Sequence, residues 1–286
     1  MSDVAAYPLT SLPASPSASP SASPPASPLL SRKILLLDAA PSRATGKPAE
    51  CAPRKDASRH ALRCGSCSMR AICMPPGLTA EELQQIESLI CPSRTIKPGE
   101  TIYRASDAFH SIYAVRAGSF KTVIMHRDGR EHVTGFHLAG DSLGLDGVCS
   151  GQHNCDAVAL EDSKVCIIPF NRLETMCREL KAVQQHVHRL MGGEIVRESS
   201  QMMLLGTMSA EQRVATFLLN LSDRLRQRGY SPAEFHLRMT REEIGSYLGI
   251  KLETVSRMLS RFQRERLIDA RGKNIRILDH DGLMRV

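Results

Sequence analysis

Three closely spaced cysteines are the first residues in this chain whose types and spacing could do chemistry. The segment "LRCGSCSMRAICMPPG" (62–77) holds Cys64, Cys67 and Cys73 in a Cys-x2-Cys-x5-Cys pattern. The chain shows no secretion signal, since "KILLLDAA" is too short and begins too late to be one. We therefore expect a reducing, cytoplasmic environment, where clustered cysteines bind metal or do redox chemistry more often than they form disulfides.

Two kinds of metal centre take four thiolates, a zinc ion and an iron-sulfur cluster. A zinc site usually pairs two Cys-x2-Cys motifs, and the sequence has only one. Three local cysteines and one distant cysteine suit a cuboidal cluster better, because each of its four iron corners binds its own thiolate. The candidates for the fourth ligand are Cys51, Cys91, Cys149, Cys155, Cys166 and Cys177. Spacing alone does not choose among them.

A second group of chemical residues lies in the segment 252–264, where apolar residues recur at helical spacing. One stripe consists of Leu252, Val255, Leu259 and Phe262, and the other side carries Glu253, Ser256, Arg257, Ser260, Arg261 and Arg264. A helix that enters the major groove of DNA needs this division, because one face packs on its domain and the other meets bases and phosphates. Arg257 can bond guanine O6 and N7, Glu253 can accept from a cytosine amino group, and Ser256 is compatible with several bases. The alternative is an ordinary amphipathic helix with solvated charges.

The residues around this segment predict a winged helix-turn-helix. Thr240 and Glu243 have the spacing of a capping box, and Gly249 divides the helical pattern into two helices. "LIDARGKNIRIL" predicts a hairpin around Gly272. From position 236 onward, eleven Lys or Arg face seven Asp or Glu, which is +4 of the chain's net +7. We expect double-stranded DNA as the partner, with Thr240 beside the second helix at the interface.

The elements that must position the cysteines lie earlier in the chain. Thr79 and Glu82 form a capping pattern, which predicts a helix to about Ile90. Between residues 93 and 170, short apolar runs are separated by turn signals such as Pro98-Gly99 and Asp128-Gly129. Their spacing predicts a small antiparallel barrel or jelly roll.

Residues 171–206 change to a helical period and predict a dimerisation helix. The seam positions of a coiled coil fall on Met191, Ile195, Glu198, Met202 and Leu205. Glu198 is unusual there, because in a two-fold dimer it lies close to its own copy and the two charges repel. The alternative is that Arg189 or Arg197 of the second copy pairs with it.

Composition completes the domain plan. Residues 1–60 predict a disordered Pro/Ser/Ala-rich tail, 61–170 the metal-binding sensor domain, 171–206 the dimerisation helix and 207–286 the DNA-binding domain. No run approaches the length of a membrane span, so we expect no membrane association. Outside the DNA-binding segment we find no nucleotide loop or acid-base constellation, so we expect no enzyme. We interpret His153, His186 and His188 as surface or packing residues, because they lack companion ligands at metal spacing.

From about Cys64 to Leu283 the chain resembles the FNR (fumarate and nitrate reduction) branch of the cyclic-AMP receptor protein family. The segments that carry the resemblance include "TGFHLAGD", "VCIIPF", "RLMGGEI", "FLLNLS" and "ETVSRMLSRFQ". It implies an α+β fold with an N-terminal antiparallel β-roll sensor domain, a long dimerisation helix and a C-terminal winged helix-turn-helix. It also implies a 4Fe-4S cluster on Cys64, Cys67, Cys73 and Cys166, and a TTGAT half-site read by Glu253, Ser256 and Arg257.

The same resemblance implies an oxygen-sensing global transcriptional regulator. An intact, oxygen-labile cluster would favour a homodimer that binds palindromic DNA, works with RNA polymerase and controls anaerobic gene expression. We expect no cyclic nucleotide, because no Lys or Arg between Asp141 and Asp162 could pair with its phosphate. A zinc-stabilised or thiol-redox DNA-binding regulator remains an alternative. An iron-sulfur electron carrier is the alternative from another class.

Overall fold

The computed structural model describes residues 64–126 and 128–286. The tail expected over residues 1–60 lies outside them. No helix in the described part of the chain is both long and apolar enough to span a membrane.

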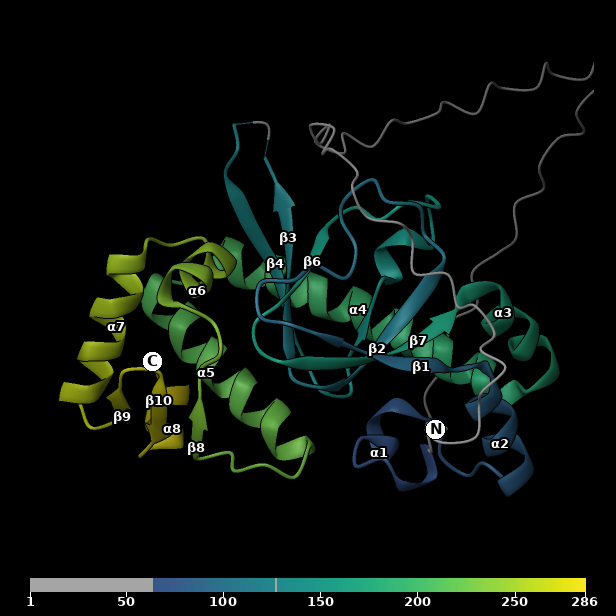
Figure 1. The fold of residues 1–286 in the computed structure, drawn as a ribbon. Helices are drawn as coiled ribbons and strands as arrows, with labels where there is room; N and C mark the ends of the chain where they lie inside the picture. The colour runs from purple at the N-terminus through teal and green to yellow at the C-terminus, as the bar shows by residue number, and fades with distance from the viewer. Residues whose placement is uncertain (1–63, 127) are drawn as a thin grey trace, which may run out of the picture. The chain divides into compact units, whose positions relative to one another are not determined.

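The N-terminal domain is an antiparallel β-roll of two small sheets, as the strand pattern predicted (Figure 1). One sheet has the strand order β1-β7-β2-β5 and the other the order β4-β3-β6. The strands are β1 (Cys91–Ile96), β2 (Ser111–Ala117), β3 (Ser119–Met125), β4 (Glu131–Leu138), β5 (Ser142–Leu143), β6 (Asp156–Ala159) and β7 (Ser163–Pro169). Fully buried side chains such as Phe120, Val115 and Val165 fill the space between the two sheets. The roll therefore has its own apolar core.

Two short helical segments and one longer helix precede the roll. They are the 3-10 helix η1 (Cys64–Ser66), α1 (Arg70–Cys73) and α2 (Ala80–Leu89). The expected capping box at the start of α2 is confirmed, because the Thr79 hydroxyl accepts from the Glu82 amide and the Glu82 carboxylate accepts from the Thr79 amide. A second 3-10 helix, η2 (Leu145–Gly147), follows β5.

The helical segment after the roll differs from the prediction of one helix over 171–206. It consists of α3 (Phe170–Glu179) and α4 (Lys181–Thr207), which meet at Leu180 in an extended conformation (φ −118°, ψ 104°). The break lets both helices bury apolar side chains in one small core, which they share with α2 and with residues 64–74, called the cysteine segment below. That core contains Cys64, Met74, Ile86, Met176 and Val183.

The C-terminal domain is the predicted winged helix-turn-helix. Its elements are α5 (Ala210–Gln227), β8 (Glu234–His236), α6 (Arg241–Leu248), α7 (Leu252–Arg264), β9 (Ile268–Arg271), β10 (Asn274–Ile277) and α8 (His280–Met284). Gly249 ends α6 with a left-handed φ of +63°, which makes the turn into α7. The wing has a third strand that the pattern did not predict, because β8 pairs with β10 in the order β8-β10-β9.

One detail of the predicted apolar stripe on α7 is wrong. Val255, Leu259 and Phe262 are buried, but Leu252 is 42% exposed. Leu252 is the first residue of the helix, where the buried face has not yet begun.

Candidate metal centre and DNA interface

The four cysteines of the predicted cluster line one pocket. Cys64 lies in η1, Cys67 in the turn after it, Cys73 at the end of α1 and Cys166 in β7. The remaining walls are mostly apolar and come from Met69, Arg70, Met74, Ile90, Ala114, Val115, Arg116 and Ile168. A loop and a strand more than ninety positions apart in sequence thus present their thiols to the same space.

Tight backbone turns bring the three local cysteines together. The Cys67 amide donates to the Cys64 carbonyl at 3.1 Å, and the Cys73 amide donates to the Met69 carbonyl at 2.9 Å. Two neighbouring helices hold this segment in place. From α2, a Glu87 carboxylate oxygen accepts from the Gly65 amide at 3.1 Å, and from α4, His186 Nε2 donates to the Cys73 carbonyl at 3.1 Å.

Strand pairing supplies the fourth thiol. In the antiparallel pairing of β2 with β7, Cys166 is the partner of Ala114. Arg116 follows two positions after Ala114 on β2 and also lines the pocket. Sequence reasoning missed this arginine, because only the pairing of β2 with β7 brings it beside the cysteines.

The thiols influence one another's protonation. Burial, followed by neighbouring Cys166, raises the pKa of Cys64 to about 11, and the same causes raise that of Cys73 to about 12. Burial also raises the pKa of Cys166, while Arg116 lowers it. Without a bound cation, the thiols of Cys64 and Cys73 therefore keep their protons, and a metal centre must displace those protons on binding.

A cuboidal cluster fits this donor set. Within residues 64–126 and 128–286, no three His, Cys, Asp or Glu side chains are grouped so that they could hold one metal ion. A 4Fe-4S cluster asks for a different arrangement, because each thiolate binds a separate iron atom. Four sulfur donors around one mainly apolar pocket meet that need.

The other cysteines are placed elsewhere, and none of those described lines the pocket. Cys149 is exposed, Cys155 is buried in the core of the roll, and Cys91 begins β1. Cys177 packs against the small core that contains Cys64. Cys51 lies outside the described residues.

The three histidines occupy surface or packing positions. The ring of His153 stacks on Tyr103 with a centroid distance of 3.7 Å, and its Nδ1 lies 3.3 Å from an Asp146 carboxylate oxygen. His188 is exposed. His186, described above, contacts the backbone of the cysteine segment.

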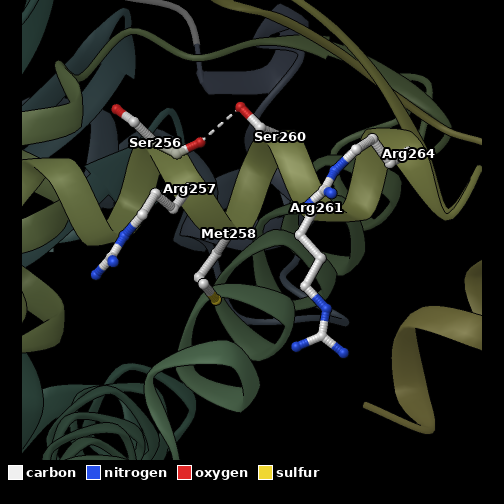
Figure 2. Close-up of a pocket in the computed structure, with 6 residues that line it drawn as sticks. All are labelled: Ser256, Arg257, Met258, Ser260, Arg261 and Arg264. Carbon is white, nitrogen blue, oxygen red and sulfur yellow. Dashed lines mark hydrogen bonds between the residues drawn. The ribbon is translucent and has the colours of Figure 1, made fainter.

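The predicted DNA-reading residues lie together on the outer face of α7. Ser256, Arg257, Ser260, Arg261 and Arg264 line one shallow depression. Figure 2 shows Arg257 and Arg261 extending away from the helix. The neighbouring Glu253 is exposed in the first turn. Burial of Val255, Leu259 and Phe262 on the opposite face fixes which side of the helix is free.

These polar side chains differ in how strongly they are held. Arg261 donates to Glu211 at 2.6 Å and to Glu265 at 2.8 Å, whereas Arg257 makes only a 3.3 Å hydrogen bond to Thr254. Among the described residues, Arg257 and Arg264 form no ion pair. Arg257 and Arg264 are therefore freer to meet DNA.

The start of α6 adds one contact that the sequence did not reveal. Arg241 Nη1 donates to the Ser256 hydroxyl at 3.2 Å and so links α6 to the outer face of α7. The exposed Thr240 hydroxyl accepts from the Glu243 amide, which confirms the capping box at this helix.

The predicted seam residues lie on α4 with unequal exposure. Ile195 and Met202 are 64% and 67% exposed, and Glu198 is exposed between them. Val196 and Met203, which the heptad spacing omitted, are also exposed. Met191 is partly buried, and Leu205 packs against the C-terminal core of its own chain.

Exposed apolar side chains in two successive pairs on one helix are what a second copy would cover. Whether Glu198 repels its own copy or pairs with Arg189 or Arg197 of that copy depends on the dimer, which a single chain does not contain. Arg197 pairs within its own helix with Glu194.

Comparison with known proteins agrees with this fold. Residues 93–180 match the cyclic nucleotide-binding domain family, and residues 212–286 match the Crp-like helix-turn-helix domain family. The chain is 43% identical over 230 residues to electron transport regulator A of Shewanella oneidensis, covering 80% of this chain and 92% of that protein.

Two further relatives are similar over most of their length. The fumarate and nitrate reduction regulatory protein of Escherichia coli K12 is 42% identical over 226 residues, covering 79% of this chain and 90% of the relative. The solved structure of FixK2 from Bradyrhizobium japonicum matches with a TM-score of 0.63 and 30% identity, covering 68% of this chain and 96% of FixK2.

The β-roll, the helix-turn-helix and these matches lead to one assignment. The chain belongs to the Crp/FNR family and is a transcriptional regulator.

Proposed function

We propose that this regulator carries an oxygen-labile 4Fe-4S cluster and controls anaerobic gene expression. The observation that carries the proposal is the single pocket lined by Cys64, Cys67, Cys73 and Cys166. The names of two relatives refer to fumarate and nitrate reduction and to electron transport, which supports a respiratory role here. When bound, the cluster would supply a centre that oxygen can attack.

The protein's own residues supply the rest of the response. The four thiols hold the metal centre, and Arg116 offsets part of their negative charge once they are deprotonated. The exposed stripe of α4 joins two copies, so that two α7 helices reach successive major grooves of a palindrome. Arg257, Glu253 and Ser256 read the bases of TTGAT half-sites, and Arg261 and Arg264 contact phosphates near them.

We further propose that the roll binds no cyclic nucleotide, although it matches that domain family. Asp146 lies in η2, within the segment that has no Lys or Arg. Burial opposes its charge, but hydrogen bonds from His153 and the Asn154 amide lower its pKa, so it stays ionised. A carboxylate there would repel a phosphate.

The test is to purify the full chain without air and measure iron, acid-labile sulfide and the visible spectrum. We expect near-stoichiometric iron and sulfide, and binding of the loaded protein to a duplex with a TTGAT palindrome. Exposure to air should remove the iron, the sulfide and the DNA binding. Zinc in place of iron would favour the zinc-stabilised alternative. Tight DNA binding that is unchanged by air would contradict the proposed oxygen response.

A further inference from the structure

The turn 138–141 at the end of β4 joins the sensor domain to the DNA-binding domain. The Asp141 carboxylate accepts hydrogen bonds from Arg224 and from Arg228, each at 2.6 Å. Arg224 lies in the last turn of α5, and Arg228 is the residue directly after that helix, with a side chain that is only 4% exposed. They also reach the backbone nearby, at the carbonyls of Phe136 and Ala139. The end of α5 is therefore held by three hydrogen bonds to this turn, two of which are charge pairs, and by one hydrogen bond to the strand before it.

The other side of the same turn contacts the cysteine segment. Gly140 has a left-handed φ of +95°, and a Cβ built on it would lie 3.0 Å from Ile72 Cγ2. Ile72 lies in α1, one position before Cys73. Ile72 therefore packs on the bare backbone of Gly140, with little room between them for a side chain at position 140.

The turn also contacts the strand behind the pocket. The Gly140 amide donates to the Val115 carbonyl at 2.7 Å, and the Val115 amide donates to the Asp141 carbonyl at 2.9 Å. Val115 itself lines the cysteine pocket. Two independent contacts, Ile72 and Val115, thus link the pocket to the turn.

Any displacement of α5 must reach the DNA-reading helix. Val214 and Leu218 of α5 share a buried core with Leu259 and Phe262 of α7. Glu211 of α5 also pairs with Arg261 of α7. The two helices are therefore packed as one unit.

We infer that Gly140 and Asp141 are positioning residues, through which the packing of Ile72 in the cysteine segment sets the placement of α5 and α7 in the same chain. This inference rests on the proposed cluster, and it adds a route from the cysteines to DNA that does not pass through the dimer seam. Burial opposes the charge of Asp141, but Arg224 and Arg228 lower its pKa, so the ion pairs persist at neutral pH.

The test compares Ile72→Ala with Ile102→Ala in the full chain. Ile102 is the matched control, because it is also a partly buried isoleucine of the sensor domain but packs against the core of the roll. Each protein is measured with the cluster loaded, as checked by iron and sulfide content, and without it. The readouts are hydrogen exchange of residues 136–141 and 220–230, and DNA affinity per dimer, with the dimer fraction taken from sedimentation.

In wild type and Ile102→Ala, we expect cluster loading to change exchange in both segments and to raise DNA affinity per dimer. In Ile72→Ala with normal iron content, the exchange changes should stop at the cysteine segment, and the gain in affinity should fall by roughly tenfold. Wild-type behaviour of Ile72→Ala would overturn the inference. Failure of the wild type to respond to loading would instead overturn the proposed function.

A second pair of variants decides the matter if Ile72→Ala loads poorly. Arg228→Gln removes one ion pair to Asp141 without touching the pocket, and Arg226→Gln removes an exposed pair to Asp223 on the same helix. With normal iron content, Arg228→Gln should lose the affinity gain on loading and Arg226→Gln should keep it. Equal gains in the two variants would overturn the inference.

Discussion

Substitution of Arg257 by alanine should separate base reading from general attraction to DNA. The Arg257 side chain is exposed and held only by a 3.3 Å hydrogen bond to Thr254, so little is lost when it leaves that partner. Almost the whole energy of a bidentate contact to guanine, about 1 to 3 kcal/mol, should therefore appear as lost affinity at one half-site. That range corresponds to about 5- to 150-fold in the dissociation constant.

A palindrome doubles the effect, because the two half-sites are separate and their contributions add. The dimer should lose about 2 to 6 kcal/mol on the full site and about half of that when one half-site is already mutated. Fluorescence anisotropy with cognate and scrambled duplexes at several salt concentrations measures both losses.

Arg264→Ala is the control for this experiment, because Arg264 lies on the same face of α7 but is assigned to phosphate. It should weaken cognate and scrambled DNA alike and reduce the salt slope by about 0.9 for each lost phosphate contact. Equal losses of Arg257→Ala on cognate and scrambled DNA would refute the base-reading role.

Three other predictions concern the seam, the buried His137 in β4 and the acid that holds Arg261. Glu198→Ala should dimerise and bind the palindrome even without iron, since it removes a like-charge pair; an apo form as monomeric as wild type in sedimentation would favour a cross-dimer pair with Arg189 or Arg197. Burial, followed by nearby Arg197, lowers the pKa of His137 to about 3, whereas in the unfolded chain its pKa is about 6.5. The unfolded chain therefore binds this proton first, so the free energy of unfolding is retained above pH 6.5 and falls as the pH is lowered toward 3. Lowering the pH from 7 to 5 should reduce the free energy of unfolding of the apo protein, measured with urea, by about 2 kcal/mol through this histidine. A His137→Gln variant whose free energy of unfolding depends on pH as steeply as that of the wild type would disprove the assignment. Glu211→Gln should raise affinity for any duplex by about two- to fivefold, because Arg261 no longer has to leave that exposed ion pair; unchanged binding would show that the pair does not compete with DNA.

The sequence was most informative where structure is decided locally. The capping boxes at Thr79 and Thr240 were readable because cap and partner are three residues apart. The same holds for the glycine turn at Gly249 and the hairpin at Gly272, where a positive φ is required. The outer face of α7 followed from helical periodicity, with the single error at Leu252.

Long-range contacts were beyond this reasoning. Spacing left the fourth cysteine open, and only the resemblance chose Cys166, because its place beside the loop depends on the pairing of β7 with β2. Arg116 depends on the same pairing. The ion pairs of Asp141 with Arg224 and Arg228 join residues more than eighty positions apart, so no local pattern reveals them. The break at Leu180 arises because α3 and α4 share a core with α2, which a heptad pattern does not record.

Iron content of two single-cysteine variants tests the central claim most directly. Cys166→Ala removes a thiol that lines the pocket, whereas Cys155→Ala removes a buried thiol from the core of the roll and serves as its matched control. After anaerobic purification, we expect Cys166→Ala to lose iron and acid-labile sulfide, and Cys155→Ala to match the wild type, because each iron corner needs its own thiolate. Normal loading of Cys166→Ala would contradict the assignment of the fourth ligand, and reduced loading of Cys155→Ala would move that ligand into the roll.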